Sequence, residues 1–388
     1  MIGWWVPFVA LFSVSLVTAL VMTPIARRIA WKVGSVDFPG ARRVNETPTP
    51  RMGGIAVFVA LAVGHVASLL VVGGPGGIPI DARLRSHVWI GLGFIAVFAT
   101  GLLDDYRSLT PKQKLAGQLL AAVVTMRGGT VIDVVVNPLT GDGIDLGLVA
   151  YPLTVLYLVA YTNIFNLIDG LDGLASGIAC IASMTMCVVS TMSAHFDAAM
   201  LALSLAGATL GFLRYNFHPA SIFLGDSGSL LVGFALGTVS MLSVSRVAGL
   251  TAIIVPLVIS GIPIIDTLSA IIRRGRAHVS IGQADKGHIH HRLMNEGLNQ
   301  RQTVLIIYVW TAALCAGSIL MTQVQVMPRI AIFCVLMVTS AVFAFRLHLF
   351  RPVLLHHYNP ETGKDELVSP QDPEFSLEEE RLEEERLV

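Results

Sequence analysis

The sequence predicts an all-α polytopic membrane protein with about 11 transmembrane helices, and three observations support this fold class. Hydrophobic residues make up 54% of the 388 residues and charged residues only 13%, and the mean hydropathy is +0.71. A soluble globular chain carries about 25% charged residues, so this chain cannot cover a water-facing surface. The apolar residues gather in long runs, and most lysines and arginines lie in alternate loops between them. This pattern excludes a soluble enzyme, a disordered chain and a disulfide-rich scaffold.

Eleven apolar runs account for the expected helices. A helix that crosses a bilayer needs about 20 mostly apolar residues, with a range of about 17 to 25. The runs cover about residues 4–26, 53–73, 88–103, 114–127, 149–168, 173–194, 197–213, 229–245, 249–272, 303–321 and 327–347. The third and fourth runs are the shortest of the eleven.

The distribution of positive charge predicts the orientation. If the first loop, residues 27–52, lies in the cytoplasm, the loops and the tail on that side contain 21 of the 26 lysines and arginines. Cytoplasmic loops of membrane proteins carry such an excess of lysine and arginine. We therefore expect the N-terminus outside and the C-terminus in the cytoplasm, which requires an odd number of crossings.

Two segments outside the apolar runs have a recognisable pattern. Residues 131–148 combine a β-branched run, a cluster of turn residues and a second short apolar run, which predicts a small β-hairpin on the outer face. The chain divides into a transmembrane domain, residues 1–348, and an acidic cytoplasmic tail, residues 349–388. The Glu/Arg spacing near the C-terminus predicts a solvated helix or a disordered tail. A partner-binding segment is the alternative for this tail.

Acidic residues near a membrane are costly and therefore informative. Asp104 and Asp105 follow Gly101 at the cytoplasmic end of the third run. Adjacent carboxylates repel each other, so this pair needs a cation or a shared proton. A divalent metal or a reacting proton would meet that need, and a solvated loop pair is the alternative.

A second polar set joins two apolar runs almost without a spacer. Asn163, Asn166, Asp169 and Asp172 follow one another at intervals of three residues, along one helical face if the helix continues. Their hard oxygen ligands suit magnesium. Helix capping and turn formation by the Asp-Gly pairs are the alternative reading.

The third set surrounds Asp226, between Gly225 and Gly228, with Asn216 shortly before it. The two glycines allow close approach of the backbone to a ligand, and Asp226 is a candidate metal ligand. The amides at the start of the eighth run are suited to bind a phosphate. A simple N-cap is the alternative role for Asp226.

The fourth set is the basic loop between the ninth and tenth runs. It contains Arg276 and three histidines, His288, His290 and His291, whose spacing matches no zinc signature. Clustered cations beside a carboxylate-rich face suit a polyanion such as a diphosphate. The positive-inside rule alone also explains the arginines. Asp266, inside the ninth run, is a separate candidate, and pairing with a basic neighbour is its alternative.

These motifs resemble those of a known family. The stretches 48–54, 101–105, 163–173, 223–229 and 288–293 occur in the same order in the polyprenyl-phosphate N-acetylhexosamine-1-phosphate transferases, glycosyltransferase family 4. The resemblance covers roughly residues 20–345. The last stretch, His-Ile-His-His-Arg-Leu, is similar to the branch that uses UDP-N-acetylglucosamine (UDP-GlcNAc) to start cell-envelope polysaccharides. The branch that transfers phospho-N-acetylmuramoyl-pentapeptide is the alternative.

The resemblance implies that residues 1–348 form a catalytic domain in a bacterial plasma membrane, with its active site at the cytoplasmic face. The expected reaction moves N-acetylglucosamine-1-phosphate from UDP-GlcNAc to undecaprenyl or decaprenyl phosphate and releases UMP. The expected cofactor is Mg²⁺, with Mn²⁺ as a substitute. The expected partners are the polyprenyl phosphate, the UDP-N-acetylhexosamine and the bilayer, without nucleic acid, and a homodimer is left open.

The resemblance also implies roles for individual residues. Catalytic roles fall to Asp104, Asp105, Asp169 and Asp172, and metal binding falls to Asp226 and Asp105. Substrate binding falls to Arg51, Asn163, Asn166, Asn216, Arg276, His288, His290 and His291. A covalent aspartyl-phosphate route stays open. A secondary transporter of an anionic substrate is the alternative from another class, and it would predict polar residues near mid-membrane and broken helices.

Overall fold

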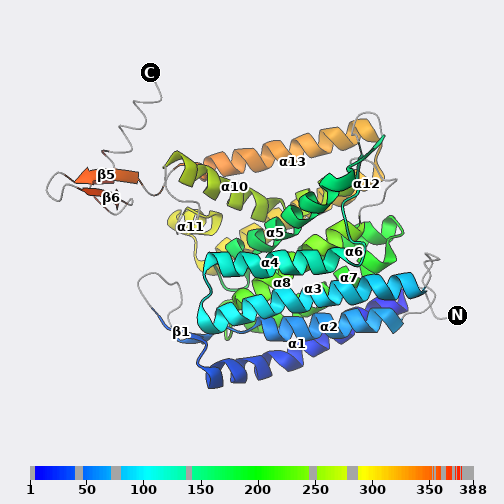
Figure 1. The fold of residues 1–388 in the computed structure, drawn as a ribbon. Coiled ribbons are helices and arrows are strands. Elements are labelled where there is room, and N and C mark those ends of the chain that lie inside the picture. Colours follow the sequence, from blue (N-terminus) through cyan, green and yellow to red (C-terminus); the bar gives the residue numbers. More distant parts are fainter. Residues whose placement is uncertain are drawn as a thin grey trace.

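Thirteen α-helices within the described residues form a bundle whose long members run roughly along one direction (Figure 1). The computed structural model describes residues 5–39, 47–70, 80–136, 142–243, 251–277 and 287–351, and parts of 353–377. The first seven helices are α1 (Val6–Val33), α2 (Gly54–Leu70), α3 (Ile80–Arg107), α4 (Pro111–Met126), α5 (Ala150–Ile168), α6 (Leu174–Met192) and α7 (Phe196–Asn216). The others are α8 (Gly225–Ser243), α9 (Thr251–Ile259), α10 (Gly261–Arg276), α11 (Ile289–Asn295), α12 (Gln300–Gln323) and α13 (Val326–Arg346).

The helices agree with a polytopic membrane protein. Within the described ranges, eight helices are long and apolar enough to cross a membrane. Each of the eleven predicted runs falls on a helix, except that the ninth run falls on two. The prediction of an all-α membrane fold is therefore confirmed.

The ninth run is divided, which corrects the prediction of one continuous helix over 249–272. Helix α9 ends at Ile259 and α10 begins at Gly261. Pro263 lies four residues after Ile259, so it has no N–H to donate to the Ile259 carbonyl, and its ring would clash with that carbonyl in a continuous helix. Hydropathy alone does not register this missing hydrogen bond.

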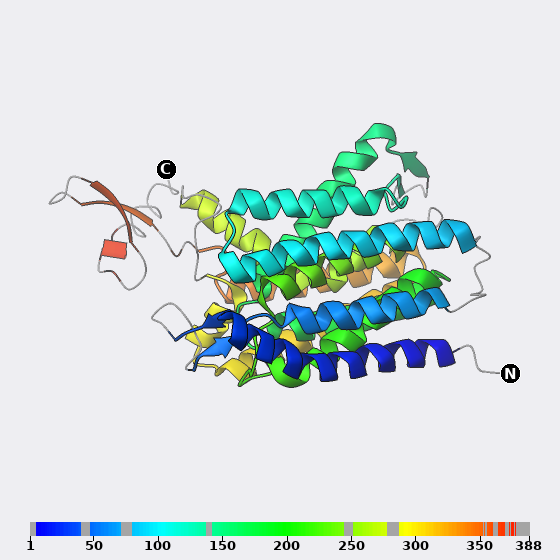
Figure 2. The same cartoon turned by 60° about the horizontal axis from the view of Figure 1, so that its bottom comes forward.

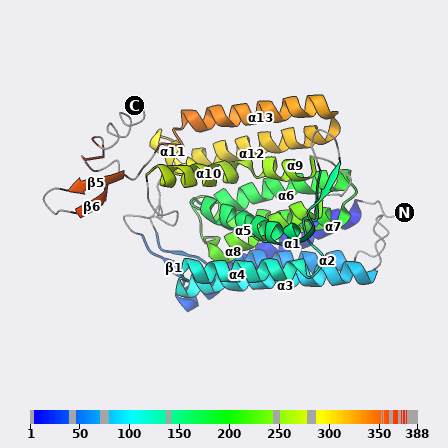
Figure 3. The ribbon, with the colours of Figure 1, turned by 45° about the horizontal axis from the view of Figure 1, so that its top comes forward.

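Helices α7 and α8 form the centre of the bundle. Buried residues make up 78% of the apolar window of α7 and 83% of that of α8, against 6% for α13. Figure 3 shows α13 at the edge of the bundle, beside α12. Small residues allow the close central packing, because a Cβ on Gly207 would lie 2.5 Å from the Phe12 oxygen of α1.

Short strand pairs lie at the two ends of the bundle. Strands β3 (Val134–Val136) and β4 (Gly143–Asp145) pair antiparallel, which confirms the hairpin expected within 131–148. In the tail, β5 (Leu355–Asn359) and β6 (Lys364–Val368) form an antiparallel pair that the sequence analysis did not predict. Figure 2 shows β5 and β6 beyond the end of the bundle opposite the start of α1. The tail helix expected near the C-terminus falls on 378–388, outside the described residues.

At the end of the bundle near α11, the first loop is fastened to the start of α8. Strands β1 (Val36–Asp37) and β2 (Thr49–Pro50) pair antiparallel. The Phe223 amide donates to the Pro50 carbonyl at 2.8 Å, and the Gly53 amide donates back to the Phe223 carbonyl at 2.9 Å. This exchange places the stretches 48–54 and 223–229 side by side, although they are far apart in the sequence.

Candidate active site

A cavity of about 760 Å³ is lined by residues of β1, β2 and α11, among others. Figure 1 shows β1 and α11 at the same end of the bundle. Eight of the predicted site residues line the cavity: Arg51, Asp169, Asp172, Asn216, Asp226, His288, His290 and His291. The structure therefore gathers residues from the first loop, the loop between α5 and α6, the α7–α8 connection and α11 around one cavity.

Asp105 of α3 holds the start of α8. One of its oxygens accepts from the Asp226 amide at 2.8 Å, and the other accepts from the Ser227 amide at 3.0 Å and the Ser227 hydroxyl at 2.5 Å. Asp105 thus acts as an N-cap supplied by another helix. Gly225 has a φ of +72°, and a Cβ there would lie 2.7 Å from the Asp105 carboxylate, so the turn requires glycine.

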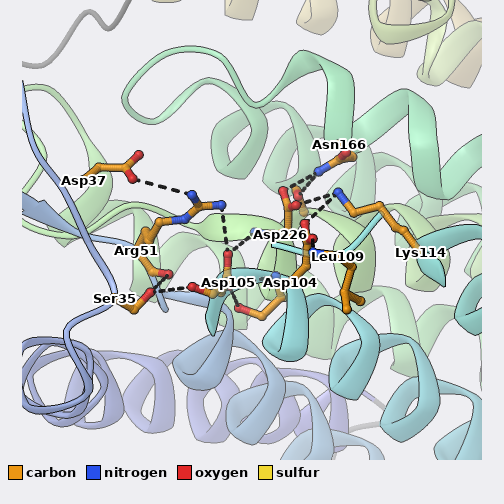
Figure 4. A network of polar contacts seen from close by, with 11 residues as sticks. Ser35, Asp37, Arg51, Asp104, Asp105, Leu109, Lys114, Asn166 and Asp226 are labelled. Atoms are coloured by element: carbon orange, nitrogen blue, oxygen red, sulfur yellow. Dashed lines mark hydrogen bonds and ion pairs between the residues drawn. The ribbon is translucent and has the colours of Figure 1, made fainter. Parts of the chain in front are cut away.

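Asp104 and Asp226 share a cation (Figure 4). The Lys114 Nζ of α4 lies 2.9 Å from the Asp104 carboxylate and 2.5 Å from the Asp226 carboxylate. The Asn166 side-chain amide donates to Asp226 and to the Ser229 hydroxyl, both at 2.8 Å. Helices α4 and α5 therefore fix the Asp226 carboxylate before any ligand binds.

Arg51 joins the first loop to the carboxylates. Its guanidinium lies 3.5 Å from Asp37 and 3.4 Å from Asp105, as Figure 4 shows. Burial alone would lower the pKa of Arg51, but the negative charges of Asp105 and Asp37 outweigh burial and raise this pKa. Arg51 therefore remains a fixed positive charge on the cavity wall.

Asn216 fastens the loop between α5 and α6. Its side-chain oxygen accepts from the Gly173 amide at 3.1 Å and the Ser176 hydroxyl at 2.7 Å, and its amide donates to the Ile222 carbonyl at 3.1 Å. The Tyr308 hydroxyl of α12 donates to the Gly173 carbonyl at 2.5 Å. Asn216 is buried, and these bonds make it a support of the cavity wall.

Asp169 and Asp172 lie in this fastened loop. Asp169 follows the last residue of α5, so the helix does not continue through the whole polar set. Burial, together with the negative charges of Asp226 and Asp105, raises the pKa of Asp169 well above its ordinary value. The Asp172 carboxylate pairs with the His218 Nδ1 at 2.9 Å. Asp169 therefore favours an added cation or a proton at this wall.

The histidines reach the cavity from α11 and from the residue before it. His288 Nδ1 lies 2.7 Å from the Asp266 carboxylate of α10. His290 packs on Gly170, where a Cβ would lie 2.6 Å from its ring. Burial, with a contribution from neighbouring His291, lowers the pKa of His290 to about 3. His290 is therefore neutral at physiological pH.

Three predicted substrate-binding residues lie outside the cavity lining: Asn163, Asn166 and Arg276. Asn166 still contacts the lining residue Asp226, whereas the other two bond elsewhere. The Asn163 amide donates to the Gln118 side chain of α4 at 2.7 Å, and Arg276 donates to the Phe350 carbonyl at 3.1 Å. The structure does not bring these two side chains to the other predicted residues. Their assignment to the substrate stays a prediction, and part of the basic loop, residues 278–286, lies outside the described residues.

The structure adds four residues that sequence reasoning did not assign to the site, namely Lys114, His218, Ser227 and Ser229. The pairing of Asp266 with His288 is the alternative that the sequence left open for Asp266. Lys114 and Asp226 are 112 residues apart in the sequence. The available signal was charge balance, because several buried carboxylates at one membrane face require cations nearby.

The arrangement limits how a metal ion could be held. In the described part of the chain, no group of three or more His, Cys, Asp or Glu side chains is placed to hold a metal ion. Asp104 and Asp226 are nevertheless carboxylates that converge on one cation, Lys114. Two hard oxygen ligands of this kind are typical of magnesium bound together with substrate phosphates.

Comparison with known proteins shows which proteins this chain is similar to. The model described as Glycosyl transferase family 4 matches residues 87–244. The probable undecaprenyl-phosphate N-acetylglucosaminyl 1-phosphate transferase of Bacillus subtilis (strain 168) is 39% identical over 336 residues, which cover 87% of this chain and 91% of that protein. The decaprenyl-phosphate N-acetylglucosaminephosphotransferase of Mycolicibacterium smegmatis is 36% identical, covering 81% of this chain and 83% of that protein.

A third relative is named for the transfer of a different group. The phospho-N-acetylmuramoyl-pentapeptide-transferase of Halalkalibacterium halodurans is 30% identical, covering 78% of this chain and 92% of that protein. Asp169 and Asp226, which line the cavity, and Asp104, which shares Lys114 with Asp226, all lie within the matched residues 87–244. Because the chain is 39% identical to the Bacillus subtilis relative over 87% of its length and matches the family model, it belongs to glycosyl transferase family 4.

Proposed function

We propose that this protein transfers N-acetylglucosamine-1-phosphate from UDP-GlcNAc to a polyprenyl phosphate, undecaprenyl or decaprenyl, and releases UMP. The product would start a lipid-linked polysaccharide of the bacterial cell envelope. The relatives named for this reaction, at 39% and 36% identity, support the choice of donor. The observation that carries the proposal is the cavity lined by Asp226 and Arg51 at one end of a membrane bundle, with Lys114 bound to Asp226.

The proposal includes eleven membrane crossings, with the cavity at the cytoplasmic face of the plasma membrane. The excess of lysine and arginine, 21 of 26 on the inferred cytoplasmic side, supports this orientation. The start of α1 and the β3–β4 hairpin lie at one end of the bundle, and β1, α11 and β5–β6 at the other (Figure 1). This separation agrees with an N-terminus outside and a C-terminus inside.

The proposed cofactor is Mg²⁺, which Mn²⁺ could replace, with Asp226 as the main protein ligand. The sequence assigned Asp105 as a second ligand, but both of its oxygens accept hydrogen bonds from residues 226 and 227. Asp104 faces the same cation as Asp226 and is the better placed second ligand. When bound, the ion supplies charge neutralisation to the diphosphate.

In the proposed reaction, the residues of the site position the acceptor phosphate and the donor. An oxygen of the acceptor phosphate attacks the phosphorus that carries the sugar, the bond from that phosphorus to the bridging oxygen breaks, and UMP leaves. Such a transfer needs charge neutralisation and in-line placement more than covalent help. A phosphate monoester has a second pKa of about 6, so Asp104 would orient the acceptor more than deprotonate it.

The other residues hold the donor. We assign the nucleotide to Asp169 and Asp172, in the loop that Asn216 fastens, and the support of Asp226 to Asn166. Arg51 and the histidines of residues 288–291, which line the same cavity, would hold the diphosphate and the sugar. The hydrogen bonds from the Arg51 guanidinium would be charge-assisted, and such bonds are about twice as strong as neutral ones.

A donor competition tests the proposal. Purified protein receives polyprenyl phosphate, Mg²⁺ and either UDP-GlcNAc or UDP-N-acetylmuramoyl-pentapeptide, and UMP release is measured. We expect UMP from UDP-GlcNAc alone, with a loss of about 100-fold or more in Asp226→Asn. UMP from the muramoyl donor alone would replace the donor and keep the reaction, whereas no UMP from either donor would overturn the proposal.

A further inference from the structure

Among the described residues, Asp266 is a buried carboxylate that the proposed reaction does not use. It lies on α10 and is 0% exposed. One of its oxygens pairs with the His288 Nδ1 at 2.7 Å, and the other accepts from the Ile289 amide at 2.8 Å. Both oxygens of Asp266 therefore contact the start of α11, the helix that carries His290 and His291.

The contact with Ile289 replaces a missing cap. His288 occupies the N-cap position of α11 with φ −62° and ψ 153°, and its own side chain makes no capping hydrogen bond. The first amides of a helix have no partner within the helix, so an outside acceptor stabilises them. Asp266 supplies this acceptor from α10 and so fixes where α11 begins.

The contact with His288 fixes the state of an imidazole. A carboxylate only accepts hydrogen bonds, so the His288 Nδ1 must carry the proton that it shares with Asp266. The His288 side chain is 9% exposed and lines the cavity. Nε2 is therefore the ring nitrogen that remains for a ligand in the cavity.

A phosphate oxygen at Nε2 would complete a defined arrangement. Phosphate oxygens, like the Asp266 carboxylate, only accept, so an imidazole between the two donates from both nitrogens and carries a positive charge. An aspartate in this position stabilises an imidazolium and holds its orientation. The parallel ring of His290, with its centroid 5.8 Å away, adds no opposing charge, because burial lowers the pKa of His290 to about 3.

We propose that Asp266 is a positioning residue for the transfer reaction, which acts by orienting His288 so that Nε2 donates to a phosphate oxygen of the donor diphosphate. This inference rests on the proposed function for the identity of the ligand. The effect on the chain itself, the proton on Nδ1 of His288, does not depend on the ligand. An outer-shell partner of this kind contributes about 10- to 100-fold to activity or affinity.

A double-mutant cycle tests whether Asp266 acts through His288. Asp266→Asn keeps the shape of the side chain but offers one accepting oxygen, so it can no longer serve both His288 and Ile289. We expect Asp266→Asn and His288→Gln each to reduce the rate of UMP release about 10- to 100-fold. In the double variant, Asp266→Asn should add less than about 2-fold to the loss already caused by His288→Gln.

Asp197→Asn is the matched control. Asp197 also lies near a buried histidine, with its carboxylate 3.6 Å from the His87 Nε2, but neither residue lines the cavity. The same substitution there should leave the rate of UMP release within about 2-fold of the wild type. If Asp266→Asn keeps the wild-type rate, or if the losses multiply in the double variant, the inference is wrong.

A second measurement does not need turnover. In protein labelled with ¹⁵N at its 11 histidines, the His288 signals are identified by their loss in His288→Gln. We expect Nδ1 of His288 to carry a proton in the free protein, and addition of UDP to shift Nε2. Asp266→Asn should remove the Nδ1 proton and weaken UDP binding about 10-fold, measured by calorimetry.

The rates of UMP release and the measurements on His288 together distinguish a failure of the proposed function from a failure of the positioning role. If the wild type releases no UMP but its His288 signals and UDP affinity respond as expected, the proposed function fails and the positioning role stands. If the wild type is active and Nδ1 of His288 carries no proton, the positioning role fails alone. Should Asp266→Asn not fold, Asp266→Glu, which displaces the carboxylate by one methylene, takes its place in the same cycle and must show the same coupling to His288.

Discussion

Asp104 and Asp105 show how neighbouring residues with the same chemistry differ in their surroundings. Successive residues of a helix point about 100° apart, so the two carboxylates of α3 face different partners. Asp105 accepts from the start of α8, whereas Asp104 faces Lys114. The sequence predicted that both belong to the site but could not separate a cap from a group that faces the cation.

Asp105→Asn should therefore act on stability as well as on activity. An asparagine offers one accepting oxygen where the carboxylate offers two, so we expect the free energy of unfolding to fall by about 1–2 kcal/mol. Asp104→Asn should change stability less, because the asparagine oxygen can still accept from the Leu109 amide and Lys114 keeps Asp226 as a partner. Thermal unfolding in detergent measures both variants, and equal losses of stability would contradict the capping role.

The neutral state of His290 predicts a pH dependence of stability. Its pKa is lowered from 6.5 to about 3 in the folded protein, so between these values the unfolded chain binds more protons than the folded one. Stability should therefore fall as the pH drops below about 6.5, by up to about 1.4 kcal/mol per pH unit. The melting temperature of His290→Gln should depend less on pH between 7 and 5. If the melting temperatures of the wild type and of His290→Gln change equally with pH, the pH dependence does not come from His290.

At the scale of elements, the sequence predicted where helices lie better than where they stop. The apolar runs located the helices, and turn residues located the β3–β4 hairpin. Averaged hydropathy did not register Pro263, so the division between α9 and α10 was missed. Lys114 was missed as a partner because its contact with Asp226 joins helices that are far apart in the sequence. The pairing of Asp266 with His288 is the alternative that the sequence left open for Asp266.

The turn before α8 offers a test at this scale. Gly225→Ala would place a Cβ 2.7 Å from the Asp105 carboxylate at a φ of +72°, so we expect a loss of at least about 1–2 kcal/mol in the free energy of unfolding. Gly275→Ala is the control, because a Cβ there has nothing within 4 Å and alanine favours a helix. A melting temperature of Gly225→Ala equal to that of the control would show that the turn tolerates a side chain.

At the scale of the whole molecule, polar chemistry is concentrated at one end of an apolar bundle. Asp226, Arg51 and the histidines of α11 line a cavity at that end, and the helices α7 and α8 behind it are mostly buried. A transporter would place its polar residues near mid-membrane. The broken pair α9–α10 is the one transporter feature among the described helices, and Asp266 just after the break serves α11 instead.

The position of the transferred phosphorus is the most direct test of the account. Protein with polyprenyl phosphate and Mg²⁺ receives UDP-GlcNAc labelled with ³²P either at the α- or at the β-phosphorus, and the lipid is then extracted. We predict that the β-label enters the lipid and that the α-label remains in water as UMP. In Asp226→Asn, we expect neither β-label in the lipid nor release of UMP. If the β-label stays in water while sugar enters the lipid, the enzyme transfers the sugar without its phosphate, and the central claim is wrong.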